Sequence, residues 1–176
     1  IPVDENYSTN PTNPYGQSKL MVEEILAWYD KIYNLRSISL RYFNAAGASL
    51  DGQFGEDHQD ETHLIPLACQ AALTHREFTV YGNDYETRDG TCVRDYVQIV
   101  DLCSAHLLTL DALTSGHKTD VFNVGPGLGF SNIEVVEMVK KVSGVDFPVK
   151  YGIRRPGDAN ELVADTSKIK KELNWQ

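Results

Sequence analysis

The stretch Asn13-Pro14-Tyr15-Gly16-Gln17-Ser18-Lys19, continued by Leu20-Met21-Val22-Glu23-Glu24-Ile25-Leu26, predicts the beginning of an amphipathic helix. Asn is a favoured helix cap. A proline in the first turn loses no hydrogen bond, because the N–H groups there have no partner within the helix. Apolar residues continue at three- and four-residue steps, so we expect the helix to span residues 14–34. Its wide apolar face favours packing on a sheet along one part and on a second subunit along another.

Two side chains of this helix form a candidate catalytic pair. Tyr15 and Lys19 are four residues apart, so they share one face of the helix. An ammonium group one turn away favours the phenolate form of the tyrosine, and a phenolate can take a proton from a sugar or alcohol hydroxyl. The same spacing occurs by chance in many helices, so the pair gains its meaning from the rest of the chain.

Residues 37–43 predict a short strand directly after the helix. A helix joined to a strand by a tight turn favours an α/β layer with a parallel sheet. The small residues Asn44-Ala45-Ala46-Gly47-Ala48 follow at once and are expected to form a loop. Because ligands of open parallel sheets lie beyond the carboxyl ends of the strands, this loop is a candidate site, although a plain turn explains it equally well.

The remaining pattern continues the alternation of helices and strands. Residues 51–62 form a long acidic loop whose charges are most simply explained as solvated surface, and Ser131 with Glu134 matches a capping box. The expected helices span 66–75, 99–114, 131–143 and, capped by Thr166 or Ser167, the segment that ends at Trp175. The expected strands span 79–82, 91–97, 121–125 and 149–151.

Two further loops have compositions that suit phosphate. Residues 125–129 are rich in glycine, but their spacing lacks the full dinucleotide fingerprint, so a structural turn is favoured. Arg154-Arg155-Pro156-Gly157-Asp158 places two guanidinium groups together in an acidic protein, and guanidinium binds phosphate in a bidentate fork. The alternative is a surface ion pair with Asp158 or Glu161.

Composition excludes several classes of function. The net charge of −9 argues against nucleic-acid binding, which requires a basic face. No apolar run approaches the roughly 20 residues of a membrane helix. Three cysteines without C-x-x-C spacing favour a reducing compartment, the cytoplasm, over a disulfide framework. The five histidines show neither H-x-x-x-H nor H-E-x-x-H, so no metal site is predicted.

Six motifs occur in an order that resembles a known family: Tyr15-x-x-x-Lys19, Arg41-Tyr42-Phe43-Asn44, Val93-Arg94-Asp95-Tyr96, Asn123-Val124-Gly125, Arg154-Arg155-Pro156-Gly157-Asp158 and Leu173-Asn174-Trp175. They resemble the extended short-chain dehydrogenase/reductase family, and within it the UDP-hexose 4-epimerases. The resemblance covers nearly the whole chain. It implies bound NAD, interconversion of UDP-glucose and UDP-galactose by transient oxidation at C4, and a homodimer through the helix at 14–34.

The same resemblance implies an α/β fold, the latter part of a Rossmann-type parallel sheet plus a smaller mixed α/β substrate-binding domain. Residues 1–47 would belong to the NAD-binding Rossmann domain and 48–176 to the substrate domain, with segments around 93–125 returning to the Rossmann sheet. The earlier part of that sheet, its Gly-rich loop and a catalytic Ser or Thr are expected to precede this chain. We therefore expect these 176 residues alone to be inactive as an epimerase.

The resemblance also assigns roles to individual residues. Tyr15 would remove the proton of the sugar 4-hydroxyl, and Lys19 would hold the nicotinamide ribose. Tyr42 and Phe43 would line the nicotinamide pocket. The substrate would be bound by a larger set: the diphosphate by Asn44, Arg94 and Arg155, the uracil by Thr79, Val80 and Tyr81, the uridine ribose by Asp158, and the nucleotide sugar by His63, Leu64 and Leu162.

Three positions depart from the family's usual pattern. His63 replaces a common Asn, and Gln98 stands where a His often follows the Arg-Asp-Tyr strand. Leu162 stands where several members carry a bulky Tyr near the sugar, which suggests room for N-acetylated sugars.

Two other functions remain open from the sequence. One is a related nucleotide-sugar enzyme, such as a UDP-pentose or UDP-uronate 4-epimerase or a dehydratase. The other is a non-catalytic nucleotide-sugar binding module, which the presence of both Tyr15 and Lys19 weakens.

Overall fold

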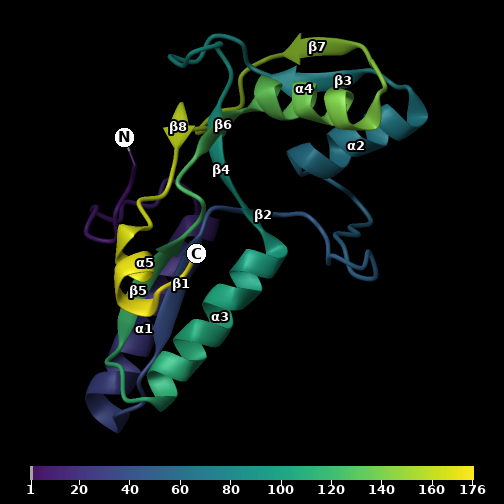
Figure 1. Cartoon of the computed structure of the whole chain (residues 1–176). Helices are drawn as coiled ribbons and strands as arrows, with labels where there is room; N and C mark the ends of the chain where they lie inside the picture. Colours follow the sequence, from purple (N-terminus) through teal and green to yellow (C-terminus); the bar gives the residue numbers. More distant parts are fainter. Residues whose placement is uncertain (1) are drawn as a thin grey trace.

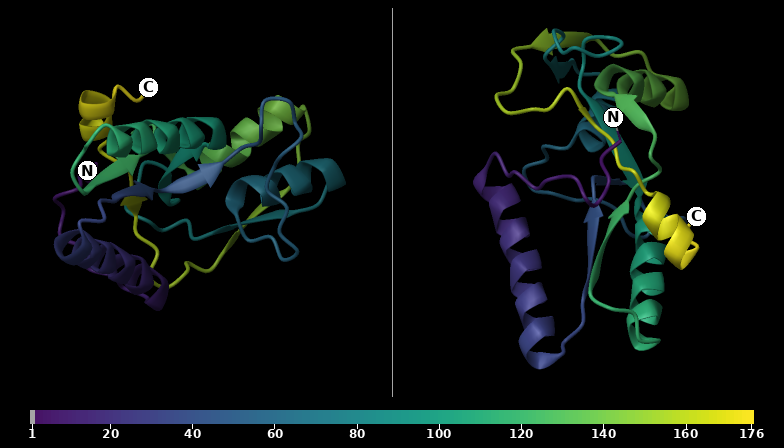
Figure 2. Two further views of the ribbon diagram at one scale, coloured as in Figure 1. Left: turned by 90° about the horizontal axis from the view of Figure 1, so that it is seen from below. Right: turned by 90° about the vertical axis from the view of Figure 1, so that its left-hand side faces the viewer.

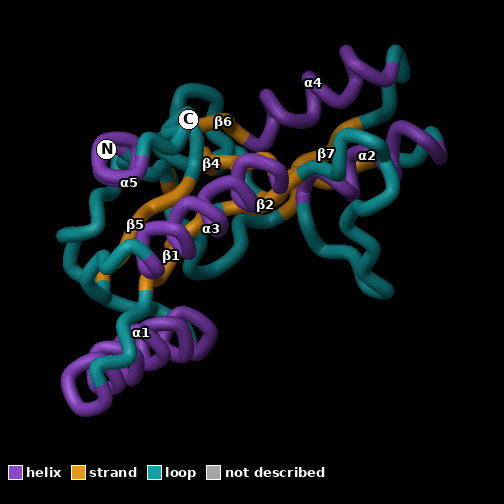
Figure 3. The backbone as a smooth tube through the Cα atoms, turned by 60° about the horizontal axis from the view of Figure 1, so that its bottom comes forward, coloured by secondary structure: helices purple, strands orange, loops and turns teal. Residues whose placement is uncertain are grey.

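A pair of parallel strands forms the centre of one lobe of the computed structural model, which describes residues 2–176 (Figure 1). β1 (Ile38–Tyr42) pairs with β5 (Asp120–Val124) in a regular register. α1 (Pro14–Tyr33) and α3 (Ile99–Thr114) lie on opposite faces of this pair, and α5 (Ser167–Leu173) lies on the α3 side (Figures 2 and 3). This arrangement confirms the predicted α/β layer, because parallel neighbours require a crossover that runs over the sheet.

The core of this lobe lies between the strand pair, α3 and α5. Phe122 and Val124 are fully buried there and pack with Ala105 and Ile169. Trp175 closes the core, and its indole Nε1 donates a hydrogen bond to the carbonyl oxygen of Asp101 at 3.0 Å. The chain's last residues therefore complete the packing of α3.

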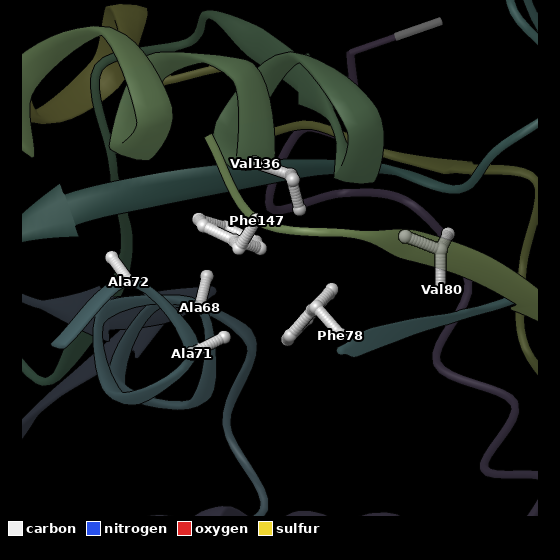
Figure 4. Close-up of a cluster of buried hydrophobic side chains, with 7 residues drawn as sticks. All are labelled: Ala68, Ala71, Ala72, Phe78, Val80, Val136 and Phe147. Carbon is white, nitrogen blue, oxygen red and sulfur yellow. The ribbon is translucent and has the colours of Figure 1, made fainter. Parts of the chain in front are cut away.

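The second lobe contains β3 (Phe78–Tyr81) paired in parallel with β7 (Val149–Gly152), together with α2 (Leu64–Thr74) and α4 (Asn132–Ser143). Figure 4 shows its core, in which three alanines of α2 face larger side chains from the other elements. Small residues let helices approach closely, while Phe78 and Phe147 fill the remaining space with ring centroids 6.3 Å apart. The core residues are Ala68, Ala71, Ala72, Phe78, Val80, Val136 and Phe147.

β4 (Val93–Gln98) joins the two lobes. It pairs in parallel with β2 (Asn44–Ala46) and β8 (Glu161–Leu162) and in antiparallel fashion with β6 (Gly129–Ser131). Successive side chains of a strand point to opposite faces. Accordingly Val93, Asp95 and Val97 are buried, whereas the side chains between them are only partly covered.

Asp95 is the one charged group in the fully buried set of residues 2–176. Its Oδ2 accepts hydrogen bonds from the backbone N–H of Gly127 at 3.1 Å and of Ala164 at 3.0 Å. A Cβ at Gly125 would come within 2.8 Å of the same oxygen, so this approach requires glycine. Burial raises the pKa of the Asp95 carboxyl, although these backbone hydrogen bonds act in the opposite direction.

No residue of α1 is fully buried, although Leu20, Glu23 and Leu26 are partly covered. Arg41 of β1 donates from Nε to Glu23 at 2.7 Å. The predicted cap is confirmed, because Asn13 Oδ1 accepts from the N–H of Gly16 at 2.8 Å. The helix ends at Asn34, which takes a left-handed conformation with φ 55°.

The predicted capping box of α4 is present, with Ser131 Oγ accepting from the N–H of Glu134 at 3.2 Å. Several boundaries were wrong. Residues 44–46 form a strand rather than the start of a loop, and α2 begins at Leu64 rather than near 66. Thr166 stands at the cap position of α5 without a capping bond; Asp165 Oδ1 accepts from Ser167 N instead.

β6 and β8 were not predicted, because strands of two or three residues contain too little of the period-two pattern to be recognised. No helix in residues 2–176 has the combined length and apolarity that a membrane crossing requires.

Removing the Asp95 carboxylate tests its structural role. We expect Asp95→Ala to lower the free energy of unfolding by about 3 kcal/mol, because two buried N–H groups lose their acceptor. Asp84→Ala, at an exposed aspartate, should change it by less than about 0.5 kcal/mol. Urea denaturation of the two variants measures both values, and equal losses would contradict the assignment.

The pH dependence follows from the raised pKa of Asp95. An acid whose folded pKa is raised destabilises the native state once the pH rises above its ordinary value of 3.8, and the cost grows until the folded pKa is passed. Asp95→Asn carries no such cost, so its stability relative to wild type should increase as the pH rises through this window. A difference that stays constant or decreases would show that the pKa is not raised.

Candidate functional site

Two adjoining cavities lie where the lobes meet. The first has a volume of about 430 Å³ and the second of about 220 Å³. They share a wall made by Asn44, His63, Leu64 and Tyr96. The wall stands just beyond the carboxyl end of β1, which is where open parallel sheets place their ligands.

The first cavity brings together residues from α1 and the end of β1. Tyr15, Tyr42 and Phe43 line it beside the small residues 45–47, which let a ligand approach the backbone. The Tyr15 side chain is 72% exposed and so is accessible to a reacting group. Lys19 does not line either cavity; its Nζ stands 5.0 Å from the centroid of the Tyr15 ring, as its spacing on α1 predicts.

The second cavity carries the positive charge. Arg94 Nη1 donates to the carbonyl oxygens of Val93 and Ala159, both at 2.8 Å, and Nη2 lies 3.5 Å from Asp158 Oδ1. Arg155 stacks its guanidinium over the ring of Tyr81 at 4.3 Å. These contacts hold two cationic groups on one cavity wall while leaving further N–H donors for an anionic ligand.

The two adjacent arginines of the basic loop make different contacts. Arg154 stacks over the Tyr85 ring at 3.9 Å, and its Nη2 donates to Asn160 Oδ1 at 2.9 Å, whereas only Arg155 lines the second cavity. The sequence left open an ion pair between these arginines and Asp158. In the structure, Asp158 pairs with Arg94 instead.

The structure places most of the predicted site residues together. Tyr15, Tyr42 and Phe43 line the first cavity, and Thr79, Tyr81, Arg94, Arg155 and Asp158 line the second.

Lys19, predicted to hold the cofactor, lines neither cavity. The same is true of two residues predicted to bind the substrate, Val80 and Leu162. The side chain of Val80 lies in the core of the second lobe (Figure 4), between Thr79 and Tyr81, which do line the second cavity. Leu162 lies on β8 opposite Arg94.

Sequence reasoning missed Tyr96, which lines both cavities. Burial raises the pKa of its phenol to about 12, so the group stays protonated and neutral. The signal was present in the period of β4, because Tyr96 is two residues from Arg94 and must share its face. The loop residues Glu56 and His58 also line the first cavity, although the sequence indicated only a solvated surface.

Asn44 joins the site to the buried framework. Its side-chain Nδ2 donates to the backbone carbonyl oxygen of Asp95 at 3.1 Å. β2 also pairs with β4 in register, Asn44 opposite Tyr96. The common wall of the two cavities is therefore fixed by the same strand that carries Arg94.

The fold and the position of the cavities define a class of protein. It is a Rossmann-type α/β protein whose candidate site lies beyond the ends of its parallel strands. A family model described as GDP-mannose 4,6 dehydratase matches residues 1–176. The chain therefore belongs to that family, which confirms the resemblance to the extended short-chain dehydrogenase/reductases.

Individual relatives are similar over the whole chain. A UDP-glucose 4-epimerase of Lactobacillus helveticus is 50% identical over 177 residues, which cover 100% of this chain and 54% of the relative. The crystal structure of UDP-glucose 4-epimerase from Brucella ovis in complex with NAD is 44% identical and superposes with a TM-score of 0.95, covering 100% of this chain and 55% of that one. The UDP-Glc/GlcNAc 4-epimerase of Campylobacter jejuni is 45% identical with a TM-score of 0.78, covering 99% and 54%.

These comparisons confirm the predicted fold and the similarity to UDP-glucose 4-epimerases. The chain spans about half the length of the relatives it matches.

Proposed function

We propose that this chain supplies the catalytic Tyr15, together with Lys19, and the substrate site of an NAD-dependent UDP-hexose 4-epimerase that interconverts UDP-glucose and UDP-galactose. The observation that carries the proposal is the adjacency of the two cavities. Tyr15 lies in one, two arginines lie in the other, and the wall between them is shared. A UDP-sugar has the same order of parts, a reactive hydroxyl at one end and a diphosphate further along.

In this proposal the second cavity binds the nucleotide. Arg94 and Arg155 hold the diphosphate through charge-assisted hydrogen bonds, which are about twice as strong as neutral ones. Asn44 adds a polar contact, Asp158 binds the uridine ribose, and the uracil lies along the Thr79, Val80 and Tyr81 strand, with Val80 contributing only its backbone. Leu64 and the backbone of His63 bind the part of the nucleotide sugar that enters the first cavity.

The chemistry takes place in the first cavity. Tyr15 takes the proton of the sugar 4-hydroxyl and returns it at the end, and Lys19 holds the nicotinamide ribose beside it. NAD, when bound, supplies a reversible acceptor for the C4 hydride. Because Arg94 and Arg155 would hold the diphosphate firmly while the sugar is held loosely, the 4-keto sugar would be free to rotate and to present its other face to the returning hydride.

The residues of the first cavity suit the nicotinamide end of that cofactor. Tyr42 and Phe43 offer aromatic surface, and residues 45–47 are small enough to let the planar ring approach the backbone. Gly47 takes a φ of +98°, which side-chain-bearing residues rarely adopt. The adenosine half would be bound by sequence that the relatives carry beyond the length of this chain.

The domain division belongs to the same proposal. Residues 1–47 form the later part of the NAD-binding domain, and residues 48–176 form the substrate domain, with the segments around 93–125 returning to the first. Pairing of β5 with β1 supports that return, because it places a later strand in the first domain's sheet.

A homodimer through the helix at 14–34 is also proposed, in a cytoplasmic protein. The support is the exposed apolar surface of α1, which the rest of this chain leaves uncovered. Its large exposed apolar residues are Met21, Val22, Ile25, Trp28, Tyr29, Ile32 and Tyr33.

The proposed nucleotide site predicts that two neighbouring arginines contribute differently to the affinity for UDP. Arg155→Ala should weaken binding of UDP to the chain by about tenfold to a hundredfold, the loss expected for a charge-assisted hydrogen bond. Arg154→Ala removes the same charge from the adjacent position but should change the affinity by less than about threefold, because Arg154 contacts Tyr85 and Asn160 instead. Isothermal titration calorimetry with UDP measures both, and equal effects would argue against the proposed site.

The catalytic part predicts a separation of turnover from binding. In the protein that carries this chain together with its NAD-binding sequence, Tyr15→Phe should lower kcat by about a hundredfold to ten-thousandfold, the range of general-base catalysis. UDP affinity should stay the same. Tyr7→Phe, at another exposed tyrosine, is the matched control. Unchanged turnover in Tyr15→Phe would favour the non-catalytic binding module.

The residue type at position 162, leucine in place of a bulky tyrosine, predicts which UDP-sugars the enzyme converts. We expect the unchanged enzyme to convert UDP-N-acetylglucosamine as well as UDP-glucose. Leu162 itself lines neither cavity, but it lies opposite Arg94, which lines the second one, so the longer side chain of Leu162→Tyr should extend toward the bound sugar. This variant should lower kcat/KM for the acetylated sugar by about tenfold or more relative to UDP-glucose. Leu162→Met keeps the size and should preserve the ratio. No turnover of the acetylated sugar by the unchanged enzyme would overturn this assignment.

A further inference from the structure

Two histidines and two glutamates lie close together, and three of the four line the first cavity. Glu56 and His58 lie in the acidic loop, and Glu61 and His63 lie at its end, immediately before α2. His63 Nδ1 stands 2.5 Å from Glu56 Oε1 and 3.0 Å from Glu61 Oε1, while His58 Nδ1 stands 3.1 Å and 3.5 Å from oxygens of the same two carboxylates. Each of the four residues offers one ligand atom, and these atoms all lie within 4.8 Å of one another.

Each imidazole of this cluster contacts more carboxylate oxygens than one linear N–H···O hydrogen bond satisfies. An imidazole Nδ1 carries at most one proton, so it makes at most one linear hydrogen bond as a donor. Here each Nδ1 faces two carboxylate oxygens at once. A tetrahedral ion bound at about 2.05 Å separates its ligand atoms by roughly 3.3 Å. The observed nitrogen–oxygen distances run from 2.5 to 3.5 Å, with Glu61 presenting Oε1 to His63 and Oε2 to His58.

The charge around the cluster also favours a cation. Residues 51–63 contain five acidic residues and neither Lys nor Arg. The other His-and-acid group, His117, Asp120 and Glu172, differs in this respect. Lys168 forms an ion pair with Asp120, and Lys118 Nζ lies 3.9 Å from the same carboxylate, so that charge is already neutralised.

We propose that Glu56, His58, Glu61 and His63 form a tetrahedral site for a divalent cation of the Zn²⁺ type. Imidazole nitrogen and carboxylate oxygen are ordinary zinc ligands. Because the ligands come from the acidic loop and from the residue that precedes α2, a bound ion fastens the loop to that helix. Glu56, His58 and His63 also line the first cavity, so the ion fixes one side of its entrance. The site does not depend on the proposed epimerase activity.

Titration of the chain with Co²⁺ tests the site, because tetrahedral Co²⁺ gives intense visible absorption bands and octahedral Co²⁺ does not. We expect one equivalent of Co²⁺ per chain, tetrahedral bands, and displacement by Zn²⁺. His58→Ala and Glu56→Gln should each weaken binding by at least about tenfold, since even losses outside the ligand shell cost that much. Both residues are exposed, so circular dichroism should report an unchanged fold.

His117→Ala is the matched control and should leave the bands and the affinity unchanged. Weak octahedral bands, or binding that survives both His58→Ala and Glu56→Gln, would overturn the proposal. Loss of the tetrahedral bands in His117→Ala but not in His58→Ala would overturn it equally, by assigning the ion to the other group.

Discussion

The buried carboxylate of Asp95 is the constraint on which the shape of the molecule depends. It accepts hydrogen bonds from the backbone at Gly127 and at Ala164, so β4, the turn before β6 and the segment between β8 and α5 are held at one point. The same residue's carbonyl oxygen receives the side chain of Asn44. A buried charge is costly unless it is hydrogen-bonded, and these bonds compensate for part of that cost.

The site follows from the alternation of β4. Because Asp95 faces inward, Arg94 and Tyr96 must face the other way, and there they line the second cavity. The lobe containing β3 adds Tyr81, and the lobe containing α1 adds Tyr15 to the adjoining cavity. One short motif of β4, Val93-Arg94-Asp95-Tyr96, therefore contains both the buried residue that stabilises the fold and the residues that line the cavity.

Much of this was predictable from local signals. The Asn13 cap, the capping box at Ser131 and the helical periods carry their information within a few residues, and they predicted helices that the structure contains. β6 and β8 could not be found this way, because such short strands are defined by their partners. The position of Leu162 outside the cavities, the inward side chain of Val80 and the convergence of His58 with His63 depend on tertiary packing, which a single sequence does not display.

The proposed function requires that this chain contain the nucleotide-binding part of a UDP-sugar site. A crystal structure of the chain with UDP tests it most directly. We predict that the diphosphate lies within hydrogen-bond distance of Arg94 and Arg155, with the uracil along the strand of Tyr81. UDP bound outside the second cavity, or in contact with neither arginine, would contradict the proposed site.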